Sequence, residues 1–312
     1  MTTRQFSPPA RTRPGRTVSR SRRAVRRVQP RFTLPAVAAP KSPGDRYELR
    51  APIGRGSGSE VWHAHDHVLD RPVAVKVMDP EHAARPRARD ELRDEARRMA
   101  SIAHPHVVRV HDFGDRLCDT RPTPFITMDL LDGRNLHELA GDERLSLLRA
   151  LRIGAQIADA VSAVHASGLV HLDVKPANVM VTADRATVVD FGISVPAGSC
   201  VSPARPSVVL GTPAYVAPER LTGGLVTPAC DVYSLGILLF WLFTGRLPWT
   251  VHTTTQLLVA HVRSEPEPFP RRRGVPGEVA ELGDRCLAKD PAARPDAREV
   301  AGTLARAFLA EA

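Results

Sequence analysis

The segment from His171 to Gly192, HLDVKPANVMVTADRATVVDFG, constrains the fold of this chain more than any other stretch. Two short β-branched runs, at 179–181 and 187–189, flank the turn-rich sequence TADRA, which predicts an antiparallel hairpin. The start of the first strand then meets the end of the second, so Asn178 and Asp190 converge. Two oxygen ligands at one point suit a hard cation such as Mg²⁺ that phosphate oxygens also hold.

Two further polar residues, Asp173 and Lys175, stand just before this hairpin. A polar loop followed by a surface turn would have no use for these residue types at these spacings. HLDVKPAN followed by DFG resembles the catalytic and metal-binding loops of the protein kinases, and Lys175 makes the chain most similar to the serine/threonine branch. The resemblance implies that Asp173 orients and deprotonates the substrate hydroxyl and that Lys175 neutralises the transferring phosphoryl group. It also implies that Asn178 and Asp190 hold Mg²⁺.

A glycine-rich stretch near the start of the kinase-like region matches the phosphate cover of that family. Residues 47–53 and 60–64 flank GRGSGS, which predicts a strand, a turn and a strand. Backbone N–H groups can approach phosphate closely at the turn glycines, which are Gly54, Gly56 and Gly58. The third glycine of the family pattern falls on Ser59 here, while Gly58 lies one place early, so the strength of phosphate binding stays open.

The next strand, PVAVKVM, alternates so that Ala74 and Lys76 point to one face, towards a shared cleft, and the valines to the other. A small side chain at Ala74 leaves room for adenine, and the Lys76 ammonium can reach the α- and β-phosphates. The alternative is an exposed edge-strand lysine. Only four of the 43 basic residues are lysines, at 41, 76, 175 and 289, so a position without a special role would carry arginine in this chain.

The stretch from 89 to 102 predicts a helix, and Glu95 lies within its apolar stripe of Leu92, Ala96, Met99 and Ala103. An acid on the inward face is costly unless it is paired, and Lys76 is the obvious partner. The alternative is a solvated glutamate among the many charges of this helix. The sequence DEARRMA matches the family here.

The segment ITMDLLDG, residues 126–133, resembles the kinase hinge. The resemblance implies that Met128 is the gatekeeper and that main-chain groups of Asp129 and Leu131 bond adenine. It also assigns three apolar side chains to the nucleotide site, those of Ile53, Val61 and Met180.

The segment GTPAYVAPE, residues 211–219, resembles the end of the activation segment, where two prolines fix an extended platform for a peptide. The resemblance implies that Glu219 is buried against Arg294. Small-molecule kinases with the same catalytic loop generally lack this platform, so a protein substrate with Ser or Thr acceptors is expected.

The resemblance implies an α+β, bilobal kinase domain over 46–310, with an antiparallel small lobe at 46–131 and a mainly helical large lobe at 133–310. ATP would lie between the lobes. The stretch 145–167 predicts an amphipathic helix. The stretch 232–243 is apolar all round, so it predicts a helix through the large-lobe core, too short to span a membrane.

The expected activity is that of an ATP-dependent, Mg²⁺-dependent serine/threonine protein kinase, including autophosphorylation. A pseudokinase or nucleotide-binding scaffold is the alternative, although such proteins typically lose a key lysine or aspartate and none is lost here. A dimer of the kinase domain is left open. A nucleic-acid-binding module would rest on the amino-terminal tail alone.

The formal net charge of +9 belongs to the amino-terminal tail, because residues 1–46 carry twelve Lys or Arg and one acid. This Arg/Pro/Ser-rich tail, residues 1–45, is expected to be disordered. Nucleic acid or an anionic membrane surface is its candidate partner, with an organellar presequence, a solvated leader or a misassigned start codon as alternatives. No signal peptide or membrane span is evident, which predicts a cytoplasmic protein.

Cysteine and histidine patterns add no further site. The cysteines are scattered, without a disulfide framework or zinc pattern, and stand at Cys118, Cys200, Cys230 and Cys286. His63, His65 and His67 alternate near a strand end, where a solvated turn is favoured over a metal site.

Overall fold

The computed structural model describes residues 46–56, 58–114, 123–142, 145–192, 194–199, 212–271 and 274–312. The described helices and strands all belong to one compact unit. The predicted disordered tail, residues 1–45, lies outside the described residues, as do Cys118 and Cys200.

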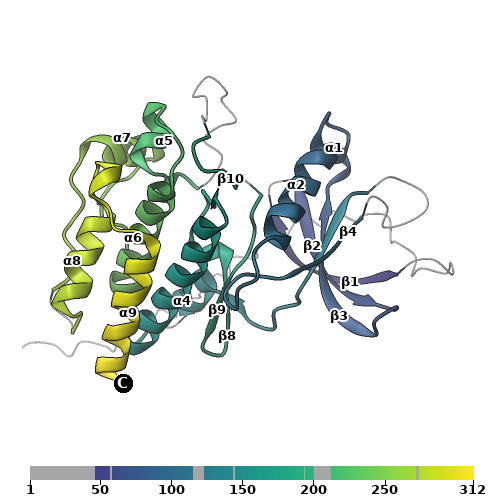
Figure 1. The fold of residues 1–312 in the computed structure, drawn as a ribbon, viewed down its shortest axis with the longest axis horizontal. Helices are drawn as coiled ribbons and strands as arrows, with labels where there is room; N and C mark the ends of the chain where they lie inside the picture. Colours follow the sequence, from purple (N-terminus) through teal and green to yellow (C-terminus); the bar gives the residue numbers. More distant parts are fainter. Residues whose placement is uncertain are drawn as a thin grey trace, which may run out of the picture. The chain divides into compact units, whose positions relative to one another are not determined.

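The amino-terminal part of the described chain is an antiparallel five-stranded sheet in the order β1-β2-β3-β5-β4 (Figure 1). Its strands are β1 (Tyr47–Gly56), β2 (Ser59–Asp66), β3 (Arg71–Met78), β4 (Val110–Gly114) and β5 (Phe125–Met128). Each consecutive pair along the sheet is antiparallel, with Lys76 of β3 opposite Val61 of β2 and Ile126 of β5. The first strand thus stands at one edge of the sheet.

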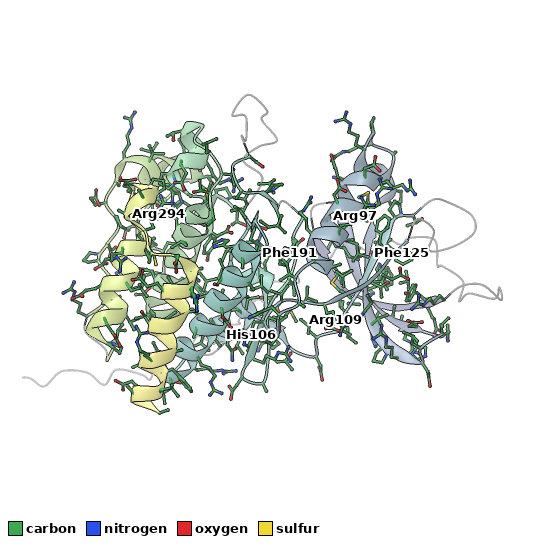
Figure 2. All side chains as sticks on the ribbon, viewed as in Figure 1. Arg97, His106, Arg109, Phe125, Phe191 and Arg294 are labelled. Carbon is green, nitrogen blue, oxygen red and sulfur yellow. The ribbon has the colours of Figure 1, made fainter. Side chains whose placement is uncertain are left out.

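The two faces of β3 pack into different cores, as its alternation predicts. Val73 and Val75 belong to a small cluster with Tyr47, Ala64 and Phe125. The Tyr47 ring meets the ring of Phe125, which is labelled in Figure 2, edge to face at 5.5 Å within this sheet. Ala74 and Met78, on the opposite face, belong to the main hydrophobic core. Lys76 therefore emerges on the face of the sheet that turns towards the main core.

Two helices accompany the sheet, α1 (Pro80–Ala83) and α2 (Ala88–Ala100). Helix α2 coincides with the predicted helix to within two residues at each end. Its buried positions are Ala88, Leu92, Glu95, Ala96 and Met99. The acid of this stripe is therefore inside the protein.

The remaining helices form the large lobe, and α4, α6, α8 and α9 lie side by side in Figure 1. Their bounds are α3 (Leu136–Asp142), α4 (Leu147–Ala166), α5 (Pro218–Thr222), α6 (Pro228–Thr244), α7 (Thr254–Arg263), α8 (Gly277–Cys286) and α9 (Ala297–Glu311). Ser146 caps α4 by accepting a hydrogen bond from the Arg149 amide. Helix α6 is almost wholly buried, as predicted, but it starts at Pro228 because proline suits the first turn of a helix.

One short strand, β6, precedes α3, and the other short strands follow α4. Their bounds are β6 (Arg134–Asn135), β7 (Leu169–Val170), β8 (Val179–Thr182), β9 (Arg185–Val188) and β10 (Val195–Pro196). The predicted hairpin is present as β8 and β9, with Val179 paired to Val188. Val188 also bonds the main chain of His106 and Val108, which ties the hairpin to the segment that enters β4. Among the described residues, no helix is both long and apolar enough to cross a membrane.

Candidate active site

The β8–β9 hairpin brings Asn178 next to the residues that follow β9. Asn178 ends a short 3₁₀ helix, Pro176–Asn178, and directly precedes β8. Its carbonyl accepts a hydrogen bond of 2.9 Å from the Val189 amide. Asp190 is the next residue and has a left-handed backbone with a φ of 67°. The antiparallel register therefore places the amide and the carboxylate at the same end of the hairpin, as predicted.

Lys76 lies between two carboxylates. Its ammonium is 2.6 Å from Glu95 Oε1 and 2.9 Å from Asp190 Oδ1. Burial opposes the charge on Lys76, but the two carboxylates outweigh it and raise the pKa of Lys76. Lys76 is thus an ammonium at neutral pH, and the alternative of an exposed edge-strand lysine is wrong.

The two carboxylates that face Lys76 differ in their pKa. Burial raises the pKa of Glu95, against the opposing effect of the Lys76 charge. Burial also works against the Asp190 carboxylate, but Lys76 and the Gly192 amide outweigh it and lower the pKa of Asp190. Asp190 is therefore ionised at neutral pH and presents negative charge at the end of the hairpin. The alternative of a solvated Glu95 is wrong, because this residue is buried.

Asp173 is held by its near neighbours in the loop. The Lys175 ammonium lies 2.7 Å from Asp173 Oδ2. The amide nitrogen of Asn178 donates both to Asp173 Oδ2 at 2.8 Å and to the Asp173 carbonyl at 3.0 Å. Because the amide nitrogen of Asn178 already donates these two hydrogen bonds, the amide oxygen is the atom of this side chain that can bind a cation.

The glycine-rich turn is shorter than the sequence predicts. Strands β1 and β2 extend into it, with Gly54 opposite Val61 and Gly56 opposite Ser59. The turn itself retains Gly58, whose φ of 88° favours glycine. A Cβ there would also fall 2.3 Å from the His82 ring. Ser57 is outside the described residues.

The residues expected to surround adenine are mostly apolar and lie on both lobes. Ala74 pairs with Met128 across β3 and β5, and both are buried. Val61 and Leu131 pack partly buried against the main core, whereas Ile53 is largely exposed. The expected set further includes Ser59, which is buried, and two half-buried residues, Asp129 and Met180. The Asp129 amide donates to the Arg109 carbonyl, which fixes the main chain at the start of the hinge.

The three alternating histidines do not form a metal site in the structure. His65 Nε2 lies 3.1 Å from Asp70, and His67 Nε2 lies 3.6 Å from Glu48, so each has its own acidic neighbour. Over the ranges that the structure describes, no three His, Cys, Asp or Glu side chains gather as metal ligands.

Comparison with known proteins agrees with this arrangement. Residues 47–303 match the protein kinase domain model. The chain belongs to the protein kinase family. The family predicted from HLDVKPAN and DFG is confirmed, and so is the bilobal α+β fold class.

The curated relatives are bacterial. The chain is 38% identical over 256 residues to a Streptomyces coelicolor protein named "Probable serine/threonine-protein kinase SCO3848", which covers 81% of this chain and 38% of that protein. It is 36% identical over 259 residues to serine/threonine-protein kinase PknB of Mycobacterium tuberculosis, covering 82% and 41%. It is 36% identical over 252 residues to PknA of the same organism, covering 80% and 58%. The chain therefore spans between about two fifths and three fifths of the length of these relatives.

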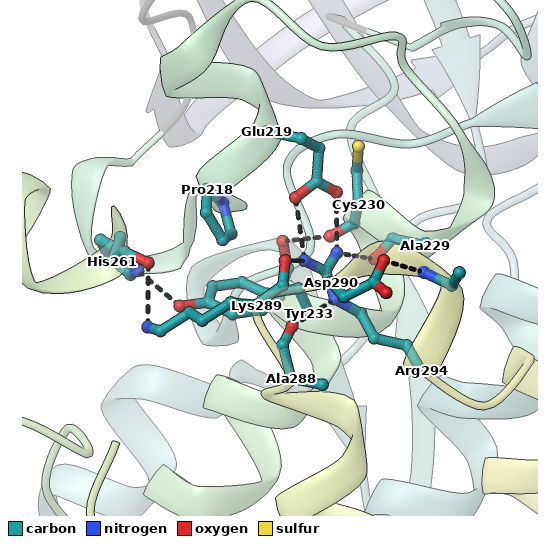
Figure 3. Close-up of polar contacts among 12 residues, drawn as sticks. Pro218, Glu219, Ala229, Cys230, Tyr233, His261, Ala288, Lys289, Asp290 and Arg294 are labelled. Carbon is teal, nitrogen blue, oxygen red and sulfur yellow. Dashed lines mark hydrogen bonds and ion pairs between the residues drawn. The ribbon is translucent and has the colours of Figure 1, made fainter. Parts of the chain in front are cut away.

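The segment that is expected to form the peptide platform is anchored by a buried ion pair. Glu219 accepts two hydrogen bonds from Arg294, at 2.7 and 2.9 Å, and Arg294 is completely buried (Figure 3). Arg294 also donates to the carbonyls of Ala229, Ala288 and Lys289. The predicted contact between Glu219 and Arg294 is therefore present, and it ties α5 to the segment before α9.

Asp231 is a site residue that the sequence analysis missed. Its carboxylate accepts hydrogen bonds from the His171 and Leu172 amides, each at 2.7 Å, and from His165 Nε2 at 2.9 Å. The His171 ring in turn lies 4.6 Å from the ring of Phe191, which Figure 2 labels, and both side chains are fully buried. An acid directly before the wholly apolar stretch 232–243 was the available signal, because an acid drawn into the core with that stretch must find partners.

His261 is a second missed residue, and it supports the platform from α7. Its Nε2 lies 3.0 Å from the Pro213 carbonyl. Its Nδ1 lies 3.2 Å from the hydroxyl of Tyr233, the neighbour that Figure 3 shows beside it. Because the carbonyl can only accept, Nε2 carries the proton and Nδ1 accepts from Tyr233. The Lys289 ammonium also binds this residue, because it donates to the His261 carbonyl at 2.9 Å. No sequence motif pointed to this contact.

Proposed function

We propose that this chain is an ATP-dependent serine/threonine protein kinase that phosphorylates protein Ser and Thr hydroxyls, itself included. The observation that carries the proposal is the placement of Lys76 between Glu95 and Asp190, while Asp173 is held by Lys175 and Asn178. The printed names of the relatives, which are serine/threonine kinases, support the acceptor class.

The charged residues divide the work of holding nucleotide and metal. Lys76 binds the α- and β-phosphates, and Glu95 keeps its ammonium in place. The donor set at the hairpin fits Mg²⁺, because Asp190 offers a carboxylate and Asn178 an amide oxygen. When bound, Mg²⁺ would neutralise charge that develops on the transferring phosphate.

Asp173 and Lys175 carry the group transfer in this proposal. Asp173 accepts the proton of the substrate hydroxyl as the hydroxyl oxygen bonds the γ-phosphorus and the bond from that phosphorus to the β-phosphate oxygen breaks. ADP departs with the electron pair of the broken bond. Lys175 donates to the transferring phosphoryl group and keeps the Asp173 carboxylate oriented, since the two lie in direct contact.

The apolar site residues hold adenine. Ala74 supplies a small side chain on the floor formed by β3, and Met128 borders it as gatekeeper. Main-chain groups of Asp129 and Leu131 bond the adenine edge. The remaining contacts are assigned to Ile53, Gly54, Gly56, Gly58, Ser59, Val61 and Met180.

The domain boundaries that we propose are 46 and 310. They are supported by Arg46, whose guanidinium bonds Asp66 and Asp112, and by α9, which packs on α4. We also propose that the kinase acts in the cytoplasm, where ATP is supplied; recovery of the native protein outside that compartment would contradict this. A dimer and an anionic partner of the tail stay predictions.

A transfer assay with radiolabelled ATP tests the function. The purified chain should label a generic basic protein and itself, and phosphoamino-acid analysis should show phosphoserine and phosphothreonine. Asp173→Asn is the inactive control. Nucleotide binding without transfer would favour the pseudokinase alternative, and dominant phosphotyrosine would overturn the acceptor class.

A further inference from the structure

The residue before Asp173 has an unusual backbone conformation. Leu172 has a φ of 67° and a buried side chain. The left-handed region is strained for an ordinary L-residue, and leucine has no side-chain polar group that would bond locally to offset the strain. Such a conformation persists only where the surroundings hold it. The contacts of the two peptide groups beside Leu172 are therefore informative.

The peptide group that precedes Leu172 is held from α6. The Leu172 amide donates to Asp231 Oδ1, and the neighbouring His171 amide donates to Asp231 Oδ2, each at 2.7 Å. Asp231 is fully buried and also accepts from His165. One ionised carboxylate thus fixes this side of the loop.

The peptide group that follows Leu172 is held at both of its ends. The Leu172 carbonyl accepts a hydrogen bond of 3.1 Å from Arg220 Nη1. The Asp173 amide donates to His171 Nδ1 at 3.2 Å. This peptide group sets the direction in which the Asp173 side chain leaves the backbone. A charge-assisted bond to its carbonyl is stronger than a neutral one.

Arg220 reaches the loop from the peptide platform. It follows Glu219 directly in α5, and the bidentate contact of Glu219 with the buried Arg294 immobilises that short helix. The Arg220 side chain is half-buried, and its surroundings include the negative charges of Asp231 and Asp173. Arg220 is thus a cation on an immobilised helix, and its guanidinium is directed at the backbone beside the proposed catalytic aspartate.

We propose that Arg220 is a positioning residue for phosphoryl transfer, which holds the Leu172–Asp173 peptide group and so couples the substrate platform to the direction of the Asp173 side chain. The inference rests on the proposed function. Leu172 is apolar and supplies no charge to the loop, so Arg220 of α5 supplies a cation at this point instead. Displacement of the platform would then misdirect Asp173 even with nucleotide in place.

Arg220→Met in the full chain tests this, with Arg220→Lys as the conservative variant. Misplacement by about 1 Å costs roughly a hundredfold in rate. We expect kcat for an external Ser/Thr peptide to fall about tenfold to a hundredfold in Arg220→Met, while KM for ATP changes less than about threefold. Arg220→Lys should recover part of kcat, because an ammonium can donate one bond to the Leu172 carbonyl.

Arg246→Met is the matched control. Arg246 lies in the same lobe, pairs with Glu267 and packs over the Phe240 ring, but it does not contact residues 171–178 in the structure. This variant should keep the wild-type kcat. An equal loss of kcat in both variants, or an unchanged kcat in Arg220→Met, would overturn the proposal.

Amide hydrogen exchange separates this inference from the proposed function. Exchange in the segment 169–178 should be faster in Arg220→Met than in wild type or Arg246→Met, and this readout needs no activity. An inactive wild-type chain would contradict the proposed function alone. Unchanged exchange in that segment would contradict the role of Arg220, whatever the activity. If Arg220→Met does not fold, the same comparison is made with Arg220→Lys, which should show a smaller change in the same direction.

Discussion

Lys76 and Asp190 stand 114 positions apart in the chain, yet the ammonium of the first lies 2.9 Å from the carboxylate of the second. The contact joins the central region of the small-lobe sheet to the end of the β8–β9 hairpin. Glu95 of α2 completes the arrangement from a third element. The charged centre therefore forms only when β3, α2 and the β8–β9 hairpin are packed together. Its residues are expected to have different roles in nucleotide binding and in transfer.

Replacing Lys76 and Asp173 should separate nucleotide placement from transfer. Lys76→Met removes the cation between Glu95 and Asp190, so we expect weaker productive binding of ATP as well as loss of rate. Asp173→Asn keeps the shape of the loop and should bind ATP nearly normally, while transfer falls by roughly 10² to 10⁴. ATP affinity and single-turnover rate, measured on both variants, check this. Wild-type turnover in Asp173→Asn would refute the mechanism.

Breaking the Glu219–Arg294 pair should destabilise the large lobe. Arg294→Met leaves the Glu219 carboxylate without its partner at a site where its side chain is only 11% exposed. We expect the unfolding free energy to fall by about 3–5 kcal/mol. The double variant Glu219→Gln, Arg294→Met should recover part of this loss. Urea denaturation measures the values.

The control for that prediction is Arg285→Met, which removes the partner of Glu299 on the surface. This pair is about half exposed on both sides, so its loss should cost about 0–1 kcal/mol. Equal losses in Arg285→Met and Arg294→Met would contradict the importance of burial at the platform.

Phosphate on the activation segment should matter little to the rate. Many regulated kinases carry arginine where Leu172 stands, and leucine cannot pair with a phosphate. The start of the segment is also fastened through its backbone, because Gly198 and Ser199 exchange hydrogen bonds of 2.8 and 3.1 Å with Val226. Arg205 and Arg220 are the alternative phosphate partners. Arg205 lies outside the described residues, and Arg220 donates to the Leu172 carbonyl.

Dephosphorylation, or alanine at Ser199, Ser202 and Ser207, should each change the rate on an external substrate less than about tenfold, or about 1.4 kcal/mol of barrier. Ser202 and Ser207 are likewise outside the described residues. A steady-state assay before and after phosphatase treatment decides the matter. A much larger loss would mean that phosphate orders the segment by another route.

His261 should make the fold sensitive to mild acid. Burial, together with the nearby Lys289 charge, lowers the pKa of His261 to about 4, although the hydrogen bond that His261 donates to the Pro213 carbonyl raises it. Between about pH 6.5 and 4 the unfolded chain binds a proton at this residue that the folded chain does not. Stability therefore falls as pH drops through that window, by up to roughly 3 kcal/mol from this group.

His261→Gln should flatten this dependence, although it lowers stability at neutral pH. Unfolding free energies measured from pH 7 to pH 4 provide the comparison, with the exposed His252→Gln as control. Parallel curves for wild type and His261→Gln would rule out this residue as a source of the acid sensitivity.

Local sequence patterns predicted the elements that carry the site. Alternation placed Ala74 and Lys76 on one face of β3, and helical spacing placed Glu95 on the inner stripe of α2. The glycine-rich turn was less well predicted, because β1 and β2 keep pairing as far as Gly56 and Ser59. Glycine composition indicates where a chain can turn, whereas the ladder of hydrogen bonds decides where it does turn.

By itself, the sequence determined the family, the order of the elements and the residue types at the proposed site, because these depend on spacings within a few residues. Only the tertiary structure decided which distant polar groups support Leu172. Asp231 lies 59 positions and Arg220 48 positions further along the chain. Periodicity describes neighbours within one helix or strand. The partner of a buried amide or carbonyl depends instead on how α5 and α6 pack beneath the loop, since an unpaired buried backbone group is costly and its partner lies wherever the folded chain places one.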